Sequence, residues 1–206
     1  MRKVDYIVIH TAAADIDEVD VEVIRKWHKA RGWSDIGYHY VIMNDRHSKY
    51  NDGDVLKGRD EETIGAHALG INANSIGICC LGHGDKTPFT EKQMISLVAK
   101  IKDLMLKYGV RLENVIGHRE VNKLVDAGKL AAQYRTDKSC PGKLVDMEVI
   151  RAYVNRGHGP DSYIVAQELV NAFIAIEDHM NTFYPNAADE WKLFRYHPEV
   201  IKLMGD

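Results

Sequence analysis

The chain has 206 residues, enough for one ordinary α/β domain with a small addition and for a hydrophobic core of useful size. Hydrophobic residues make up 45% and charged residues 28% of the sequence, a balance typical of globular rather than disordered proteins. The formal net charge of -3 argues against a protein that binds nucleic acid through overall positive charge.

The sequence predicts neither an export signal nor a membrane span. The N-terminal apolar run YIVI, residues 6–9, is too short for a signal-peptide core or a membrane span. We therefore expect synthesis in the cytosol without a signal peptide, and no membrane insertion. Three cysteines do not suggest a disulfide framework. Cys79 and Cys80 fall in a strand-like run and are predicted core residues, whereas Cys140 lies in a polar turn.

The first half of the chain predicts strands and one helix. Residues 4–9 form an apolar strand that ends directly before His10, and the ends of such strands are where sites gather in α/β sheets. Apolar spacing predicts a helix over 21–32, which a glycine ends. Aromatic and β-branched residues predict a strand over 37–43, and an Asn-Asp-Gly turn joins it to a short strand over 54–57 as a hairpin.

The second half continues the alternation. A buried strand is predicted over 75–81, and Thr90 opens a long helix with a capping box. A short strand over 114–116 leads to His118, and helices are predicted over 121–134 and 146–154. This order predicts an α/β fold with a single central mixed β-sheet flanked by helices.

A change in composition marks a predicted boundary near residue 156. Two glycines and a proline follow within residues 157–160, and helical spacing resumes over 161–180. From residue 157 onward there are eight acidic and three basic residues. We therefore expect a main domain over 1–156 and a small acidic helical appendage over 157–206, too short to hold a large core alone.

Two histidines and a cysteine stand at the ends of predicted elements: His10, His118 and Cys140. Nitrogen and thiolate ligands suit Zn²⁺, and three protein ligands leave one position open, as in catalytic zinc sites. The spacing is long and forms no local metal motif. Taken singly, each histidine is more typical of a surface or hydrogen-bonded polar residue than of a metal ligand.

Several segments together resemble a known family. Residues from about Val4 to Gly142 are similar to the type 2 N-acetylmuramoyl-L-alanine amidases, which include small bacteriophage lysozyme-amidases and are related to animal peptidoglycan recognition proteins. The matching segments are YIVIHTA, GWSDIGYHYVIM, GRDEETIGAHALGINANSIGICCLG, GHREV and KSCPG. The resemblance covers about two thirds of the chain in the family's order, and it implies the same α/β fold and one catalytic zinc ion.

The resemblance also implies roles for individual residues. His10, His118 and Cys140 match the family's zinc ligands, Tyr38 an active-site tyrosine and Lys138 the catalytic lysine of the phage enzymes. Zinc lowers the pKa of its bound water to about 7 and polarises the scissile carbonyl, and a lysine can stabilise the oxyanion that forms. The tyrosine can position the water, or donate to the oxyanion or the leaving amine.

Other interpretations of these residues remain open. His67 matches a histidine that lines the substrate groove, but it can also be a helix-cap or surface residue. Tyr38 can pack on the sheet, and Lys138 can be a solvated turn charge. Alternation along the strand turns His39 away from Tyr38, so His39 is left out of the site.

Two neighbours of His118 are harder to place. Glu120 is either a partner of the metal ligands or part of a surface ion pair, and Arg119 has no assigned role. The chain departs from the small family members in the 21 residues between His118 and Cys140, where their connection is much shorter. We expect this extra segment to form part of the groove wall.

The resemblance implies a peptidoglycan amidase that cuts between N-acetylmuramic acid and L-alanine. A phage endolysin fits best, because an enzyme without a signal peptide reaches the wall through a separate pore-forming protein. A cytosolic muropeptide-recycling amidase is the first alternative, although its relatives carry aspartate in place of Cys140. A non-catalytic peptidoglycan-binding module is the second. A protein partner such as RNA polymerase is a further expectation that the sequence does not test. The acidic appendage is expected to dock on the catalytic domain or to aid wall recognition.

Overall fold

The computed structural model describes residues 2–156. The chain divides into two units, residues 1–157 and 158–206, and the description concerns the first of them. The helix predicted over 161–180 and the rest of the acidic appendage lie outside the described residues. Among the helices that are described, none is both long and apolar enough to cross a membrane.

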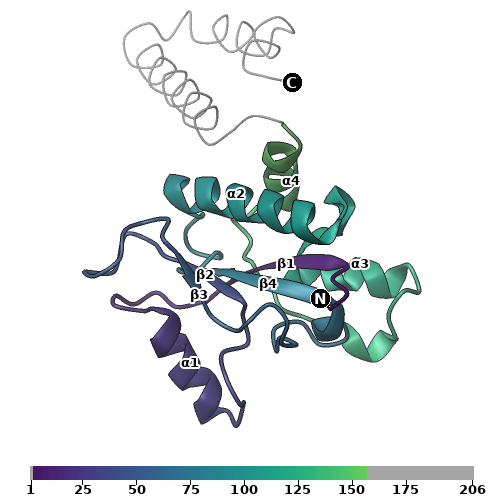
Figure 1. Ribbon diagram of the computed structural model, residues 1–206, viewed down its shortest axis with the longest axis horizontal. Coiled ribbons are helices and arrows are strands. Elements are labelled where there is room, and N and C mark those ends of the chain that lie inside the picture. Colours follow the sequence, from purple (N-terminus) through teal and green to yellow (C-terminus); the bar gives the residue numbers. More distant parts are fainter. Residues whose placement is uncertain (1, 157–206) are drawn as a thin grey trace, which may run out of the picture. The chain divides into compact units, whose positions relative to one another are not determined.

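A five-stranded sheet forms the centre of this unit, in the order β3-β2-β4-β1-β5 (Figure 1). The strands are β1 (Tyr6–Thr11), β2 (Tyr40–Ile42), β3 (Val55–Lys57), β4 (Ser75–Cys80) and β5 (Val115–Gly117). Strand β3 runs antiparallel to β2 as the expected hairpin, while the other neighbours are parallel. The predicted mixed α/β sheet is therefore confirmed.

Four α-helices surround the sheet: α1 (Val21–Ala30), α2 (Glu91–Tyr108), α3 (Val121–Asp126) and α4 (Met147–Asn155). The capping box predicted at Thr90 is present, since its hydroxyl accepts from the Gln93 amide at 3.0 Å while the Gln93 side chain accepts from the Thr90 amide at 3.1 Å. Gly109 ends α2 in the left-handed conformation, at φ 68°. Residues 2–156 also contain four short 3₁₀ turns: η1 (Asn72–Asn74), η2 (Leu112–Asn114), η3 (His118–Glu120) and η4 (Ala132–Tyr134).

The two faces of the sheet are packed differently. Helix α2 covers one face, and α1 lies on the opposite side of the sheet (Figure 1). The α2 face holds the largest apolar cluster, in which Ile7, Ile9 and Ile78 of the sheet meet Leu97 and Ile101 of the helix. All five of these side chains are fully buried. Burial of such a side chain stabilises the fold by roughly 1.5–3 kcal/mol.

The opposite face carries two smaller apolar clusters. One forms around Ile24 of α1 and Val41 of β2, and the other around Val8 of β1 and Leu124 of α3. Because side chains alternate along a strand, His10 shares the face of Val8. On β4, Ser75, Gly77 and Cys79 likewise face away from the α2 cluster that holds Ile76, Ile78 and Cys80. This face therefore combines apolar packing with buried polar groups.

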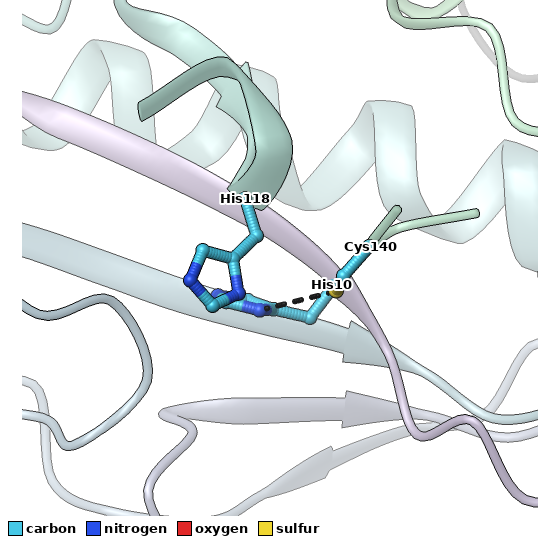
Figure 2. A group of neighbouring side chains, drawn as sticks. All are labelled: His10, His118 and Cys140. Carbon is cyan, nitrogen blue, oxygen red and sulfur yellow. Dashed lines mark hydrogen bonds between the residues drawn. The ribbon is translucent and has the colours of Figure 1, made fainter. Parts of the chain in front are cut away.

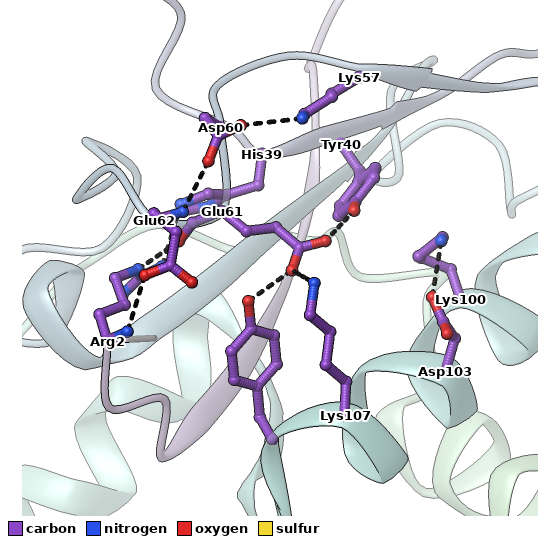
Figure 3. A network of polar contacts seen from close by, with 11 residues as sticks. Arg2, His39, Tyr40, Lys57, Asp60, Glu61, Glu62, Lys100, Asp103 and Lys107 are labelled. Carbon is purple, nitrogen blue, oxygen red and sulfur yellow. Dashed lines mark hydrogen bonds and ion pairs between the residues drawn. The ribbon is translucent and has the colours of Figure 1, made fainter.

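The loop after β3 is fastened to α2 by a network around Glu61 (Figure 3). Its carboxylate accepts from the hydroxyls of Tyr40 and Tyr108 and from Lys107 Nζ at 2.7 Å. Burial raises the pKa of Glu61, but hydrogen bonds from Lys107, Tyr108 and Tyr40 outweigh it and lower this pKa to about 2. Arg2 links the same loop to the start of β4. Its guanidinium donates to the Glu61 carbonyl and to the Ala73 and Ser75 carbonyls, the last two at 3.0 and 2.7 Å.

Two predicted elements differ from the structure. The helix expected over 121–134 ends at Asp126, because Gly128 takes a left-handed conformation at φ 68° and its amide turns back to the Val125 carbonyl. The strand expected over 37–43 is shorter, and Tyr38 lies before β2 begins at Tyr40. The spacing of apolar residues in the sequence predicted neither the end of α3 at Asp126 nor the start of β2 at Tyr40.

Candidate metal centre

Two of the three expected metal ligands are brought together by neighbouring parallel strands. His10 lies near the end of β1, and His118 begins η3 directly after β5. The register pairs Ile9 with Gly117, so the next residue on each strand emerges at the same edge. The two imidazole centroids are 4.8 Å apart. The carboxyl ends of parallel strands thus supply two of the three expected ligands, as is typical of this class of sheet.

Cys140 completes the group from a loop, as Figure 2 shows. The ligand atoms of His10, His118 and Cys140 all lie within 4.8 Å of one another, and His10 Nδ1 is 3.6 Å from Cys140 Sγ. Tetrahedral zinc with bonds of about 2.0–2.1 Å to nitrogen and about 2.3 Å to sulfur requires a separation of about 3.6 Å between two such ligands. The donor types of all three residues, and the separation of His10 Nδ1 from Cys140 Sγ, therefore fit a zinc ion.

The protonation of these groups also suits a metal. Burial, and then nearby Lys138, lowers the pKa of His118 to about 4, and burial holds the pKa of His10 well below its ordinary value. Both imidazoles are therefore neutral at pH 7 and offer lone pairs. Burial raises the pKa of the Cys140 thiol to about 11, so metal binding at neutral pH releases its proton.

Tyr38 stands beside the group. Its ring centroid is 5.0 Å from that of His10 and 5.4 Å from that of His28, and the Gly37 amide donates to His28 Nδ1 at 2.9 Å. Burial, and then the neighbouring thiols of Cys79 and Cys140, raises the pKa of Tyr38 well above its ordinary value. The phenol therefore keeps its proton at neutral pH and is a hydrogen-bond donor.

His67 is a buried residue, with only 8% of its surface exposed. Its Nδ1 lies 3.1 Å from His10 Nε2, so it contacts one expected ligand directly. His39 is not one of the three ligands, as expected, yet its ring lies edge-on to His67 with centroids 5.6 Å apart. Strand alternation therefore did not keep His39 apart from the residues around the site.

A groove of about 500 Å³ opens next to these residues. Its lining includes His67, His118, Lys138 and Trp33, and Arg135 of the extra segment after His118. None of the described residues that line it is acidic, and two are basic: Lys138, and Arg135, which is paired with Asp126. Such a groove favours a substrate that carries carboxylates.

Comparison with known proteins decides the family. A family model described as N-acetylmuramoyl-L-alanine amidase matches residues 1–143. The chain belongs to this family. The resemblance inferred from the sequence motifs is thus confirmed, and the chain is an amidase. The family is typically zinc-dependent, and the His-His-Cys group of the amidase fits such an ion.

Individual relatives agree with the family. The endolysin of Escherichia phage T7 is 42% identical over 110 residues, which span 50% of the amidase and 68% of that protein. Peptidoglycan-recognition protein SC2 of Drosophila melanogaster is 32% identical over 126 residues, which span 56% of this chain and 64% of that protein. The solved structure of the amidase LysC from Clostridium intestinale superposes with a TM-score of 0.61 at 31% identity, covering 75% of this chain and 87% of that chain.

Arg119, which had no role in the sequence interpretation, holds the loop of Cys140 in the amidase. Its amide donates to the Cys140 carbonyl at 2.7 Å, and its guanidinium donates to the carbonyls of Ser139 at 3.1 Å, Val145 at 2.6 Å and Gly142. A planar guanidinium can serve several acceptors at fixed angles, which a lysine cannot do. Arg119 therefore fastens the cysteine loop to the turn that carries His118.

Asp85 fastens the same loop from the other side. Its carboxylate accepts from the Ser139 hydroxyl and from the Lys143 amide, both at 2.7 Å. Gly84 approaches so closely that a Cβ there would lie 2.0 Å from the Pro141 carbonyl oxygen. No sequence motif predicted this contact.

Glu120 is a buried structural partner of the η3 turn. It accepts from the Gly117 amide at 2.9 Å, from Arg151 at 2.9 and 3.0 Å and from Lys123 at 2.6 Å. Burial raises its pKa, but the bonds from Arg151, Lys123 and Gly117 outweigh this and lower the pKa of Glu120 to about 2. Glu120 therefore supports the backbone before His118 and is not part of an exposed ion pair.

Proposed function

We propose that the protein is a zinc-dependent peptidoglycan amidase that hydrolyses the bond between N-acetylmuramic acid and L-alanine, and that it acts as a phage endolysin. The observation that carries the proposal is the 3.6 Å separation of His10 Nδ1 and Cys140 Sγ, with His118 in the same group. Endolysins of phages T7 and T3 are both 42% identical to the matched segment, which supports the assignment to cell-wall lysis after release from the host cytoplasm.

A zinc ion held by His10, His118 and Cys140 would supply Lewis-acid activation of water and of the scissile carbonyl. Tyr38 donates a hydrogen bond toward the reacting group, because its phenol remains protonated at neutral pH. Lys138 is exposed at the groove and places positive charge where the oxyanion develops. His67 borders the same groove, which orients the muramyl peptide along the sheet edge.

Cys140 argues for the lytic enzyme over the muropeptide-recycling alternative, whose relatives carry aspartate at the third ligand position. A thiolate is a softer ligand than a carboxylate and suits zinc well. The groove lining also favours an anionic peptide, and peptidoglycan stem peptides carry free carboxylates.

The test is digestion of purified peptidoglycan, with metal content measured on the same samples. Wild type is expected to hold about one zinc ion and to release new L-alanine amino termini without new reducing sugar ends. Cys140→Ala is expected to lose both properties. Cys80→Ala is the matched control, because Cys80 is equally a free cysteine but lies buried in the α2 cluster.

Each alternative has its own outcome. Zinc binding without release of amino termini would point to a peptidoglycan-binding module. Strong preference for soluble muropeptides over intact wall would point to recycling. A wild-type protein that hydrolyses the wall without zinc would overturn the ligand assignment.

A further inference from the structure

The buried hydroxyl of Ser75, on β4, sets the direction of a short hydrogen-bond chain. Ser75 Oγ lies 2.7 Å from the Ile71 carbonyl oxygen, to which it must donate its only proton. The same oxygen lies 3.4 Å from His67 Nε2, so toward His67 it acts as the acceptor. The proton of His67 is therefore on Nε2, and its Nδ1 carries a lone pair.

That lone pair determines the state of His10. His67 Nδ1 lies 3.1 Å from His10 Nε2, which must donate to it. The bond to His67 therefore places a His10 proton on Nε2, while Nδ1 faces Cys140 Sγ at 3.6 Å. The reverse order would leave His67 Nε2 with a lone pair toward a hydroxyl whose proton is already used.

The ring of His67 is closely packed on several sides, which restricts its rotation. A Cβ on Gly65 or on Gly77 would lie 2.6 Å from His67 Cδ2, so both glycines are in direct contact with the ring. His39 closes a further side, and is itself fixed because its Nδ1 accepts from the Gly77 amide at 2.9 Å. Ser75 is fully buried, so water does not compete for its hydroxyl.

We propose that Ser75 and His67 are positioning residues that fix the tautomer of His10, so that Nδ1 is the atom presented to the metal. The proposal rests on the proposed function only for the identity of the metal as zinc. It gives His67 a role distinct from binding substrate. Partners of this kind, beyond the direct ligands, commonly change metal affinity by roughly 10–100-fold.

The experiment measures zinc affinity by chelator competition on the full chain, together with the ¹⁵N resonances of the His10 ring in the zinc-loaded protein. His67→Phe removes the acceptor and is expected to weaken zinc binding roughly 10–100-fold. His67→Asn can place its amide oxygen near the position of Nδ1, and is expected to restore most of the affinity. In wild type, the ring resonances should show Nε2 protonated and Nδ1 bound.

Ser75→Ala is the milder variant and keeps the test valid if His67→Phe does not fold. It is expected to weaken zinc binding by a few-fold, on the order of the smallest effects of such partners. Thr90→Ala is its matched control, because it also removes a hydroxyl but at the α2 cap, away from His67. The control should leave zinc affinity and the His10 resonances unchanged.

The outcomes separate this proposal from the proposed function. Unchanged zinc affinity and His10 resonances in both His67→Phe and Ser75→Ala overturn the positioning role, even if the wall is hydrolysed normally. A raised KM with unchanged zinc affinity also overturns it, and returns His67 to substrate binding. Weakened zinc binding in a chain whose wild type hydrolyses no peptidoglycan supports the positioning role while the proposed function fails.

Discussion

The two faces of strand β4 show how one strand serves both stability and chemistry. Ile76, Ile78 and Cys80 point into the apolar cluster under α2. Ser75, Gly77 and Cys79 alternate with them on the opposite face and are all small. The small side chains leave room for rings that other segments supply: the ring of His67 occupies the space where a Cβ of Gly77 would lie.

On the face of β4 that carries Ser75, Gly77 and Cys79, here called the site face, small residues replace large apolar side chains and leave space for the histidine rings of the site. The face of β4 that packs against α2 needs only apolar side chains of suitable size, so the strand sequence alone indicates that this face is part of the core. The site face needs buried neutral histidines with hydrogen-bond partners, because an unpaired buried polar group costs stability. Substitutions on the two faces should therefore separate folding stability from zinc binding and catalysis.

The largest expected effect is on catalysis, through Lys138 at the groove and Tyr38 beside His10. Lys138→Ala should lower kcat by roughly 10²–10³-fold, since it removes positive charge near the oxyanion. Tyr38→Phe should lower kcat by roughly 10²-fold through loss of a proton donor. Steady-state hydrolysis of muropeptides measures both, with zinc content determined in parallel. Lys143→Ala and Tyr50→Phe are the matched controls. A loss of zinc in Lys138→Ala or in Tyr38→Phe would mean that the substituted residue supports the metal instead of the reaction.

The next effect compares the two faces of β4 directly. Gly77→Ala places a Cβ 2.6 Å from the His67 ring, which must move, so zinc affinity should fall roughly 10–100-fold. Ile78→Val on the other face should cost about 1 kcal/mol of unfolding free energy and leave zinc affinity unchanged. Chelator competition and urea denaturation measure the pair. Equal losses of affinity in both variants would remove the distinction between the faces.

A smaller effect is expected where the cysteine loop meets the sheet. Arg119→Gln should weaken zinc binding by roughly tenfold, because the loop of Cys140 loses its bonds to the guanidinium. Arg119→Lys should recover little, since an ammonium does not reach several carbonyls in a plane. Arg111→Gln, at an exposed ion pair, is the control. If Arg119→Lys bound zinc as tightly as wild type, charge alone would account for the role.

The smallest expected effect lies in the Glu61 network, away from the ligands. Because its pKa is lowered from about 4.5 to about 2 on folding, Glu61 stabilises the fold above pH 4.5, and this contribution is lost as pH falls toward 2. Glu61→Gln should cost roughly 1 kcal/mol at pH 7, after allowance for solvent screening, and less at pH 3. Urea denaturation at both values tests this, and an equal loss at both would contradict it. Zinc affinity should not change.

Much of the fold could be predicted because its causes are local. The capping box of Thr90 and the buried strand predicted over 75–81 depend on neighbours in the chain, and the structure shows both. The three candidate ligands were noticed at the ends of predicted elements and matched to zinc ligands through the resemblance, since their spacing forms no motif. The structure places their ligand atoms within 4.8 Å of one another. The family and its enzymatic class are confirmed by the match over residues 1–143.

The supporting residues could not be predicted because their partners are distant in sequence. Arg119 donates to carbonyls 20 and more residues away, and carbonyl groups carry no sequence signal. Asp85 bonds residues 54 and 58 positions later. One signal was available but not used: Ser75, Gly77 and Cys79 leave one face of a buried strand without bulk, which indicates that other side chains fill it. Gly128 likewise marked the end of α3.

The distance along the chain between His10 and Cys140 has a consequence for how the site comes into being during synthesis. The two residues are 130 positions apart, and His118 lies between them. The first ligand leaves the ribosome long before the last, so a growing chain holds an incomplete set until the loop after residue 139 has emerged. A metal ion held by these three residues would join the first strand to this later loop and close a ring of about 130 residues. Such an ion could find its full set of protein ligands only after residue 140 has left the ribosome.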